Sequence, residues 1–256
     1  MIIYSIANQK GGVGKTTTAQ ALIEGLAERG YKVLGIDLDG QRNLTTGTGA
    51  DKSKPNIMDA LTGKATAPEV IQHLQSGDIM PASKNLAGAD AIITSTGKEY
   101  RLKELLATLA GQYDYCIIDT PPALGILTIN ALTASNSVII PIQADLYSLE
   151  GTDQLATTLE PVKKYCNPEL KVAGLLLTRY NARTILSREV AEVAGALAKR
   201  LGSSLFKTTI RETIKVKEAQ LSQRGVLSYD PKAKVAEDYR AFIQELLERE
   251  ATSGRV

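Results

Sequence analysis

The sequence predicts an α/β fold in which a doubly wound, mostly parallel sheet is flanked by helices. Three apolar runs, at residues 116–118, 138–140 and 175–177, are continuous rather than alternating, as expected for strands that are covered on both faces. Segments of helical length and period separate such runs, and this alternation favours parallel strands. No repeat, low-complexity tract or linker divides the chain, so we expect one domain over residues 1–256.

Seven runs of apolar and β-branched residues, bounded by turn residues, predict strands. They lie at residues 2–7, 32–37, 78–81, 114–119, 137–142, 171–178 and 205–209. Residues 16–29 have a helical period and end at Gly30, a helix stop. Residues 235–250 are amphipathic with an acid-rich polar face. Because anionic lipid would repel that face, we expect this segment to pack on the domain.

The composition is that of an ordinary soluble protein, with 43% hydrophobic and 23% charged residues. No apolar run approaches the length of a membrane span, and Cys116 and Cys166 form neither a metal-ligand spacing nor a disulfide framework. We therefore expect a cytoplasmic protein with no membrane partner. The net charge is +2, but residues 161–235 carry 15 Lys or Arg against 6 Asp or Glu, so this part of the chain is strongly basic.

Residues 8–18, NQKGGVGKTTT, lie between the first predicted strand and the first predicted helix. The three glycines let successive backbone N–H groups turn toward an anion, and the helix that starts near Lys15 adds the positive end of its dipole. In such a phosphate loop, Lys15 contacts the β- and γ-phosphates and Thr16 contacts Mg²⁺. The usual pattern needs a glycine at Gln9, and a second lysine, Lys10, follows instead.

Residues 10–17 (KGGVGKTT) resemble the deviant Walker A motif of the ParA/MinD family of dimeric ATPases. The resemblance implies ATP and Mg²⁺ as cofactors and a nucleotide-sandwich homodimer in which Lys10 reaches the phosphates bound by the other subunit. Charge develops on the phosphate oxygens during transfer, so a cation supplied only on dimerisation makes hydrolysis conditional on assembly. The nucleotide-binding residues implied are Lys10, Gly11, Gly12, Val13, Gly14, Lys15, Thr16 and Thr17.

Two further segments are similar to the same family. Residues 36–43 (IDLDGQRN) resemble a strand-end segment, usually Asp-Leu-Asp-Pro-Gln-Gly-Asn, whose second aspartate orients the attacking water; here it is Asp39. Gly40 replaces the proline and predicts a looser turn. Residues 115–122 (YCIIDTPP) resemble the Walker B strand and second switch, which implies Mg²⁺ binding by Thr16 and Asp119, partly through water. The implied catalytic residues are Lys10, Lys15 and Asp39. Residues 141–144 and 148–151 also resemble the family, without an assigned role.

The resemblance favours a DNA-partition ATPase of the small, Soj-like ParA form. It implies weak ATP hydrolysis, an ATP dimer that binds double-stranded DNA nonspecifically and associates with the nucleoid, and release when a ParB-like centromere-binding partner stimulates hydrolysis. Residues 180–184 and 214–219 resemble DNA-contacting stretches, and phosphates need cations without a particular geometry. The DNA-binding candidates are Arg183, Lys215, Lys217 and Arg224. Because the phosphate loop begins at residue 10, we expect no N-terminal helix-turn-helix.

Other classes with this kind of core stay open. They are a MinD-like membrane-associated positioning ATPase, a ParA-like ATPase that positions a protein cargo, and an electron-transfer protein like the nitrogenase iron protein. The sequences around Cys116 and Cys166 do not resemble exposed cluster ligands. At the adenine end, the family's usual Ile-Pro-Arg-Asn is replaced by IRET at residues 210–213, so the base pocket is open to interpretation. His73 has no partner carboxylate or histidine spaced for a metal site.

Overall fold

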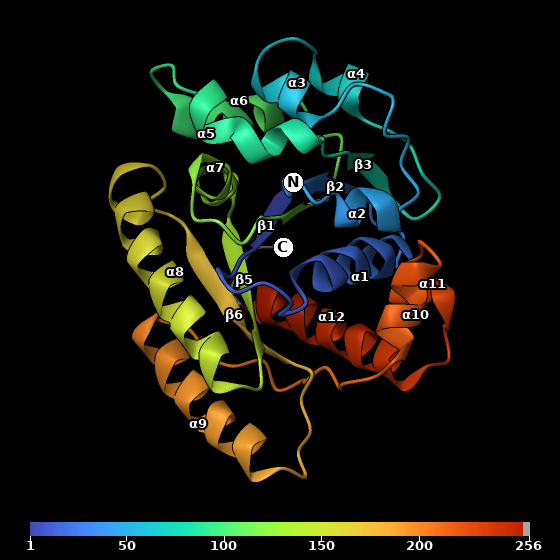
Figure 1. Ribbon diagram of the computed structural model, residues 1–256, viewed down its shortest axis with the longest axis vertical. Helices are drawn as coiled ribbons and strands as arrows, with labels where there is room; N and C mark the ends of the chain where they lie inside the picture. The colour runs from blue at the N-terminus through green and yellow to red at the C-terminus, as the bar shows by residue number, and fades with distance from the viewer. Residues whose placement is uncertain (253–256) are drawn as a thin grey trace.

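The computed structural model describes residues 1–252 (Figure 1), apart from the side chains of residues 146–153, so the family-like stretch at 148–151 lies outside the described side chains. Within the described residues, one six-stranded sheet has the order β3-β2-β4-β1-β5-β6, and every neighbouring pair is parallel. This confirms the predicted doubly wound α/β fold. The strands are β1 (Ile2–Ile6), β2 (Val33–Asp37), β3 (Asp78–Met80), β4 (Tyr115–Asp119), β5 (Ser137–Gln143) and β6 (Lys171–Thr178).

Helices cover both faces of this sheet. One face carries α1, α11 and α12, and the other carries α3 to α7 over one half and α8 and α9 over the other. The helices are α1 (Lys15–Ala27), α2 (Asn43–Gly47), α3 (Ile57–Leu61), α4 (Ala67–Val70), α5 (Ala89–Ile92), α6 (Arg101–Ala107), α7 (Ile126–Ala134), α8 (Leu146–Tyr165), α9 (Ile185–Arg200), α10 (Lys215–Leu221), α11 (Val226–Tyr229) and α12 (Lys234–Thr252).

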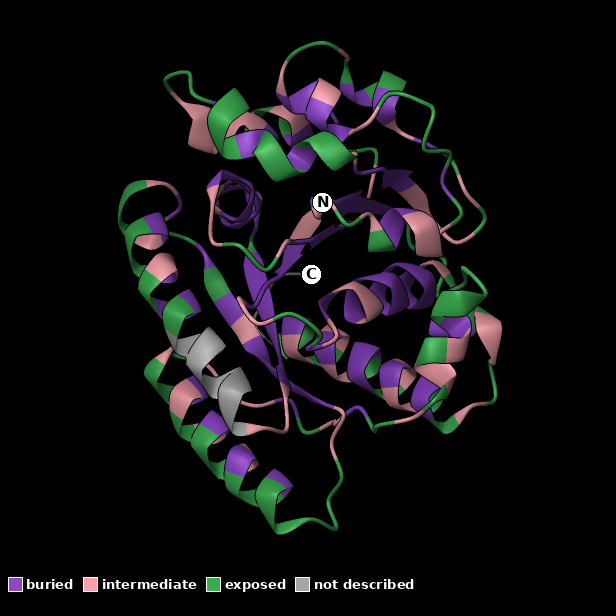
Figure 2. Ribbon diagram, viewed as in Figure 1, coloured by how far each residue is buried: buried purple, intermediate pink, exposed green. Residues whose placement is uncertain are grey.

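Continuous apolar strands follow from this two-sided cover, because successive side chains of a strand point to opposite faces. In β4, Ile117 packs with the α1 and α12 side, whereas Cys116 and Ile118 pack with α3, α6 and α7. Figure 2 shows the strands buried along most of their length. A strand exposed on one face would have alternated polar and apolar residues.

The strand predicted at residues 205–209 is wrong. Leu205 forms only an isolated bridge with Leu175, and the backbone N–H groups of Lys207 and Thr208 donate to the carboxylate of Glu245 on α12, at 2.8 and 2.9 Å. These donors are therefore used by a side chain and cannot extend a ladder beside β6. The segment fastens α12 to the edge of the sheet instead.

The C-terminal helix α12 packs against α1, as the acid-rich pattern predicts. Its buried residues include Tyr239, Phe242 and Ile243, and the Phe242 ring meets that of Phe206 edge to face at 4.8 Å. Near its end, the buried Glu250 accepts a hydrogen bond of 2.8 Å from the Tyr115 hydroxyl. Within residues 1–252, no helix is both long enough and apolar enough to cross a bilayer.

Phe242→Ala is expected to lower the free energy of unfolding by about 3–5 kcal/mol, because the ring is fully buried and its removal leaves a cavity between α12, α1 and the sheet. Chemical denaturation measures this change. The control Leu221→Ala removes a side chain that is 86% exposed and should change stability by less than about 0.5 kcal/mol. Equal effects of the two substitutions would contradict the packing of α12.

Candidate nucleotide-binding site

The carboxyl ends of β1, β2, β4 and β6 meet at one edge of the sheet, where open α/β sheets bind their ligands. A cavity of about 460 Å³ lies there. Segments that the sequence analysis singled out line it: the phosphate loop, the turn after β2, residues 210–213 and the start of α10. The lining includes Gly11, Gly12, Gly14, Lys15, Thr16, Thr17, Asp39, Thr178, Arg179, Ile210, Arg211, Glu212, Thr213, Val216, Lys217 and Tyr239.

The phosphate loop runs from the end of β1 into α1 and is held by neighbouring strands. Gly12 and Gly14 have φ of 78° and 88°, a region that glycine enters without the steric cost of a Cβ. The Thr178 hydroxyl at the end of β6 donates to the Val13 carbonyl at 2.8 Å. Asn8 donates to the Pro141 carbonyl in β5, also at 2.8 Å. The loop is therefore fixed before a ligand arrives, with the N-terminus of α1 beneath it.

Lys15 lies at the start of α1 and is only 7% exposed. Its ammonium donates to the Lys10 carbonyl across the loop at 3.1 Å. Burial lowers the pKa of Lys15, and the carboxylates of Asp119 and Asp39 oppose that shift. A cation held in this way, beside backbone amides at a helix N-terminus, favours an anionic ligand.

Asp119 ends β4 as a fully buried carboxylate, directly opposite Asp37 at the end of β2. Neither Asp119 oxygen has a hydrogen bond within 3.5 Å among the described residues. Burial and the nearby Asp37 carboxylate raise the pKa of Asp119 well above its ordinary value; the Thr16 hydroxyl and Lys15 offset this only in part. A buried acceptor without a donor fits a cation, and a carboxylate with a hydroxyl is the hard oxygen set that Mg²⁺ prefers.

Asp37 supports the turn that carries Asp39. Its carboxylate accepts hydrogen bonds from the backbone N–H of Asp39 at 3.0 Å and from the N–H and hydroxyl of Thr45 at 2.8 and 2.7 Å. Burial raises the pKa of Asp37 to about 6, against these hydrogen bonds, which favour its charged form. A Cβ at Gly40 would come within 3.2 Å of the Ala87 backbone nitrogen. Close packing against Ala87 therefore accompanies the glycine that replaces the family's proline.

Lys10 forms an ion pair within this chain that its sequence did not predict. Its ammonium lies 2.5 Å from Asp145, immediately before α8, and both side chains are 26% exposed. The Lys10 backbone N–H also donates to the Asn8 side chain at 3.0 Å. A lysine beside the phosphate loop is thus held by a carboxylate that follows β5, 135 residues away in the sequence.

The four DNA-binding candidates fall into two places. Arg183 is exposed in the loop between β6 and α9, whereas the others lie on or just after α10, well apart from it in Figure 1. Lys215 pairs with Glu218 at 3.1 Å, and a hydrogen bond with Glu218 raises the pKa of Lys215. Arg224 donates to the Ser228 carbonyl. Lys217 is exposed but also lines the nucleotide cavity, a position that the charge pattern did not indicate.

Residues 210–213, where the sequence departs from the family's usual Ile-Pro-Arg-Asn, line the cavity. Arg211 in this segment makes two hydrogen bonds of 2.6 Å to Asp238 on α12. Thr178, Arg179 and Tyr239 also line the cavity, and sequence reasoning missed them. Thr178 and Arg179 could have been found because they lie at the end of a predicted strand, whereas Tyr239 is one of two aromatic residues on the apolar face of α12.

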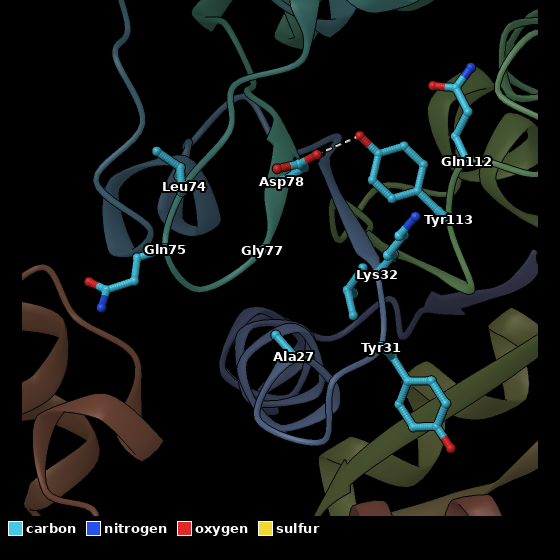
Figure 3. Close-up of a pocket in the computed structure, with 10 residues that line it drawn as sticks. Ala27, Tyr31, Lys32, Leu74, Gln75, Gly77, Asp78, Gln112 and Tyr113 are labelled. Atoms are coloured by element: carbon cyan, nitrogen blue, oxygen red, sulfur yellow. Dashed lines mark hydrogen bonds between the residues drawn. The ribbon is translucent and has the colours of Figure 1, made fainter.

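A second cavity, of about 330 Å³, lies at the opposite edge of the sheet, where β2 and β3 begin (Figure 3). Asp78 and Tyr113 lie on its wall, and the Tyr113 hydroxyl donates to Asp78 at 2.6 Å. His73 lies 2.9 Å from the same carboxylate, a neighbour that its sequence spacing did not indicate. Among the described residues, no group of three or more His, Cys, Asp or Glu could hold a metal ion here.

Asp119→Asn is expected to stabilise the metal-free protein, and more so as the pH rises. The pKa of Asp119 is raised on folding, so the folded chain binds more protons than the unfolded one, and stability falls as the pH rises from the unfolded pKa through the folded pKa. Denaturation with a chelator, between about pH 5 and pH 9, measures the slope. The exposed control Glu104→Gln should keep the slope of the unaltered chain; the same slope in Asp119→Asn would contradict the assignment.

The chain is similar over most of its length to known ATPases. A family model described as an AAA domain matches residues 1–172. The sporulation initiation inhibitor protein Soj of Bacillus subtilis is 41% identical over 249 residues, covering 95% of this chain and 97% of that protein. The chromosome partitioning protein ParA of Myxococcus xanthus is 38% identical over 253 residues, covering 97% and 88% of the two chains.

The chain is also similar over its whole length to a solved structure. Cobyrinic acid a,c-diamide synthase from Mycobacterium smegmatis, with bound ADP and magnesium, matches with a TM-score of 0.85 and 37% identity over 100% of this chain and 97% of that one. Another structure of that protein holds an ATP analog and magnesium. These are the cofactors that the sequence predicts. The chain therefore belongs to the ParA/Soj family of P-loop ATPases in the MinD superfamily.

Proposed function

We propose that this protein is an ATP-dependent, dimerising partition ATPase. In the ATP state it binds double-stranded DNA nonspecifically, and it is released when a ParB-like centromere-binding partner stimulates hydrolysis. The observation that carries the proposal is the pair of lysines of the phosphate loop: Lys15 is buried and lines the cavity, whereas Lys10 is partly exposed and paired with Asp145. The names of the Soj and ParA relatives support the same function.

The cofactors are ATP and Mg²⁺, and the chain acts on them as one domain. The backbone of residues 11–17 and the Lys15 ammonium hold the phosphates, and Thr16 and Asp119 hold the metal, partly through water. Mg²⁺ neutralises charge on the phosphate oxygens. Asp39, which lines the cavity, orients the water that attacks the γ-phosphate to give ADP and phosphate.

Lys10 makes assembly a condition for hydrolysis. In the single chain its ammonium is satisfied by Asp145, so reaching the phosphates of a second subunit requires that this ion pair break. A nucleoside triphosphate carries more negative charge than a carboxylate. Exchanging Asp145 for the phosphates is therefore favourable for Lys10 only when a partner subunit presents bound ATP. Hydrolysis by the chain alone is consequently weak.

The dimer then joins two weakly cationic surfaces into one DNA-binding surface. Linked sites raise avidity without new contacts, so DNA binding follows the nucleotide state. Arg183, Lys215, Lys217 and Arg224 supply cations for the phosphate backbone, and the protein is cytoplasmic and associates with the nucleoid in the ATP state. A protein-cargo or membrane-positioning ATPase becomes the better assignment if DNA binding fails, although α12 uses its apolar face against α1.

Lys10→Ala is expected to abolish the ATP-dependent dimer, because the cation that crosses to the other subunit is lost. Asp145→Asn should have the opposite effect and lower the ATP concentration needed for dimerisation by about two- to fivefold, the size expected for breaking a partly exposed ion pair. Sedimentation with ATP and Mg²⁺ measures both, and the exposed Lys64→Ala is the matched control. A dimer that persists in Lys10→Ala would refute the role given to Lys10.

Binding to a labelled duplex of arbitrary sequence is expected only with ATP and Mg²⁺, and should weaken steeply with salt because cations on the protein displace counterions from the phosphates. Arg183→Ala should weaken it for every sequence and reduce the salt slope by about 1 for each chain. Arg183 lies outside the set of residues that line the cavity, so ATP binding should be unchanged. The exposed Lys52→Ala is the control; no DNA binding in either nucleotide state would reject the partition assignment.

A further inference from the structure

A buried hydroxyl joins three elements behind the turn that carries Asp39. Thr45 lies on α2 and is fully buried. Its hydroxyl donates to the Asp37 carboxylate at the end of β2, at 2.7 Å, and accepts a hydrogen bond of 2.8 Å from the backbone N–H of Ala82, two residues after β3. A threonine hydroxyl has one hydrogen to donate and lone pairs to accept, so both functions of this group are in use.

The same contacts lead directly to Asp39. One oxygen of Asp37 takes the two hydrogen bonds from Thr45, and the other accepts the Asp39 backbone N–H at 3.0 Å. The Asp39 carbonyl in turn accepts the N–H of Arg42 at 2.8 Å, which brings the chain round into α2. Thr45 therefore fixes both ends of the turn: its start through Asp37, and its end because Thr45 itself lies on α2.

The far end of α2 is fastened to the phosphate-loop helix. Gln20 on α1 donates to the Gly47 carbonyl at 2.7 Å, and a Cβ at Gly47 would come within 2.6 Å of the Gln20 side chain. A helix of only five residues is not stable alone. The position of α2, and with it that of the Asp39 turn, depends on these contacts to β2, to the segment after β3 and to α1.

We propose that Thr45 is a positioning residue for ATP hydrolysis, which acts by holding the Asp39 turn through Asp37 and Ala82. This inference rests on the proposed ATPase function. A displacement of a water-orienting group by about 1 Å can cost about 100-fold in rate, so loss of the hydroxyl should affect the chemical step. Thr45 itself lies behind the turn and is not among the residues that line the cavity, so nucleotide binding should be spared.

Thr45→Val keeps the shape of the side chain and removes the hydroxyl. We expect kcat to fall about tenfold while KM for ATP changes by less than about twofold, and Thr45→Ser to restore kcat. Thr48→Val is the matched control, because within the described part of the chain the Thr48 hydroxyl hydrogen-bonds only to carbonyls of its own helix, at 3.0 and 3.1 Å; it should leave kcat unchanged. An unchanged kcat in Thr45→Val would overturn the proposal.

Hydrogen exchange on the nucleotide-free protein separates this inference from the ATPase assignment. In Thr45→Val, the amides of Asp39, Gln41 and Ala82 should exchange faster, whereas those at the start of α1 should not. Faster exchange throughout the chain would indicate general destabilisation and would overturn the positioning role. If Thr45→Val does not fold, Asp37→Asn leaves one acceptor oxygen, which can serve either Thr45 or the Asp39 N–H but not both; it therefore loosens the same turn and is read by the same exchange of Asp39 and Gln41. No turnover by the unaltered chain would reject the ATPase proposal, and exchange would still decide whether Thr45 holds the turn.

Discussion

The site depends on charge that is held away from water at one edge of the sheet. Lys15 and Asp119 are both buried, and burial disfavours the charged form of each, lowering the pKa of Lys15 and raising that of Asp119. A buried charge without a partner of opposite charge destabilises the folded chain. An anionic phosphate beside Lys15 and a cation beside Asp119 supply what each lacks. The parallel strands, which end together, make this arrangement possible.

The C-terminal helix α12 also contributes to the wall of this cavity. Tyr239 on α12 is buried, lines the cavity and lies 3.4 Å from the Thr18 hydroxyl on α1. Asp238, the adjacent residue, holds Arg211, which lines the same cavity. The apolar face of α12 completes the core, and Asp238 on its polar face holds Arg211 at the cavity wall.

Local patterns predicted the parts of the fold and site that local chemistry determines. Six of the seven expected strands form, and the phosphate loop, Asp39 and Asp119 all lie at the predicted edge, because a motif fixes its own turn and strand end. Contacts between distant segments were not predictable in this way. The apolar pattern at 205–209 could not reveal that Glu245 takes its backbone donors, and nothing near Lys10 in the sequence points to Asp145.

Pairing with carboxylates also offsets the basic charge in residues 161–235. Arg211 pairs with Asp238, which lies outside that segment, and Lys215 pairs with Glu218 within it. Cations that already have carboxylate partners attract DNA phosphates less than their number suggests, because the partner's field opposes them. A single chain should therefore be a weak DNA ligand despite the excess of nine positive charges. Under the proposed function, weak DNA binding by each chain would let ATP-dependent dimerisation decide whether DNA is held.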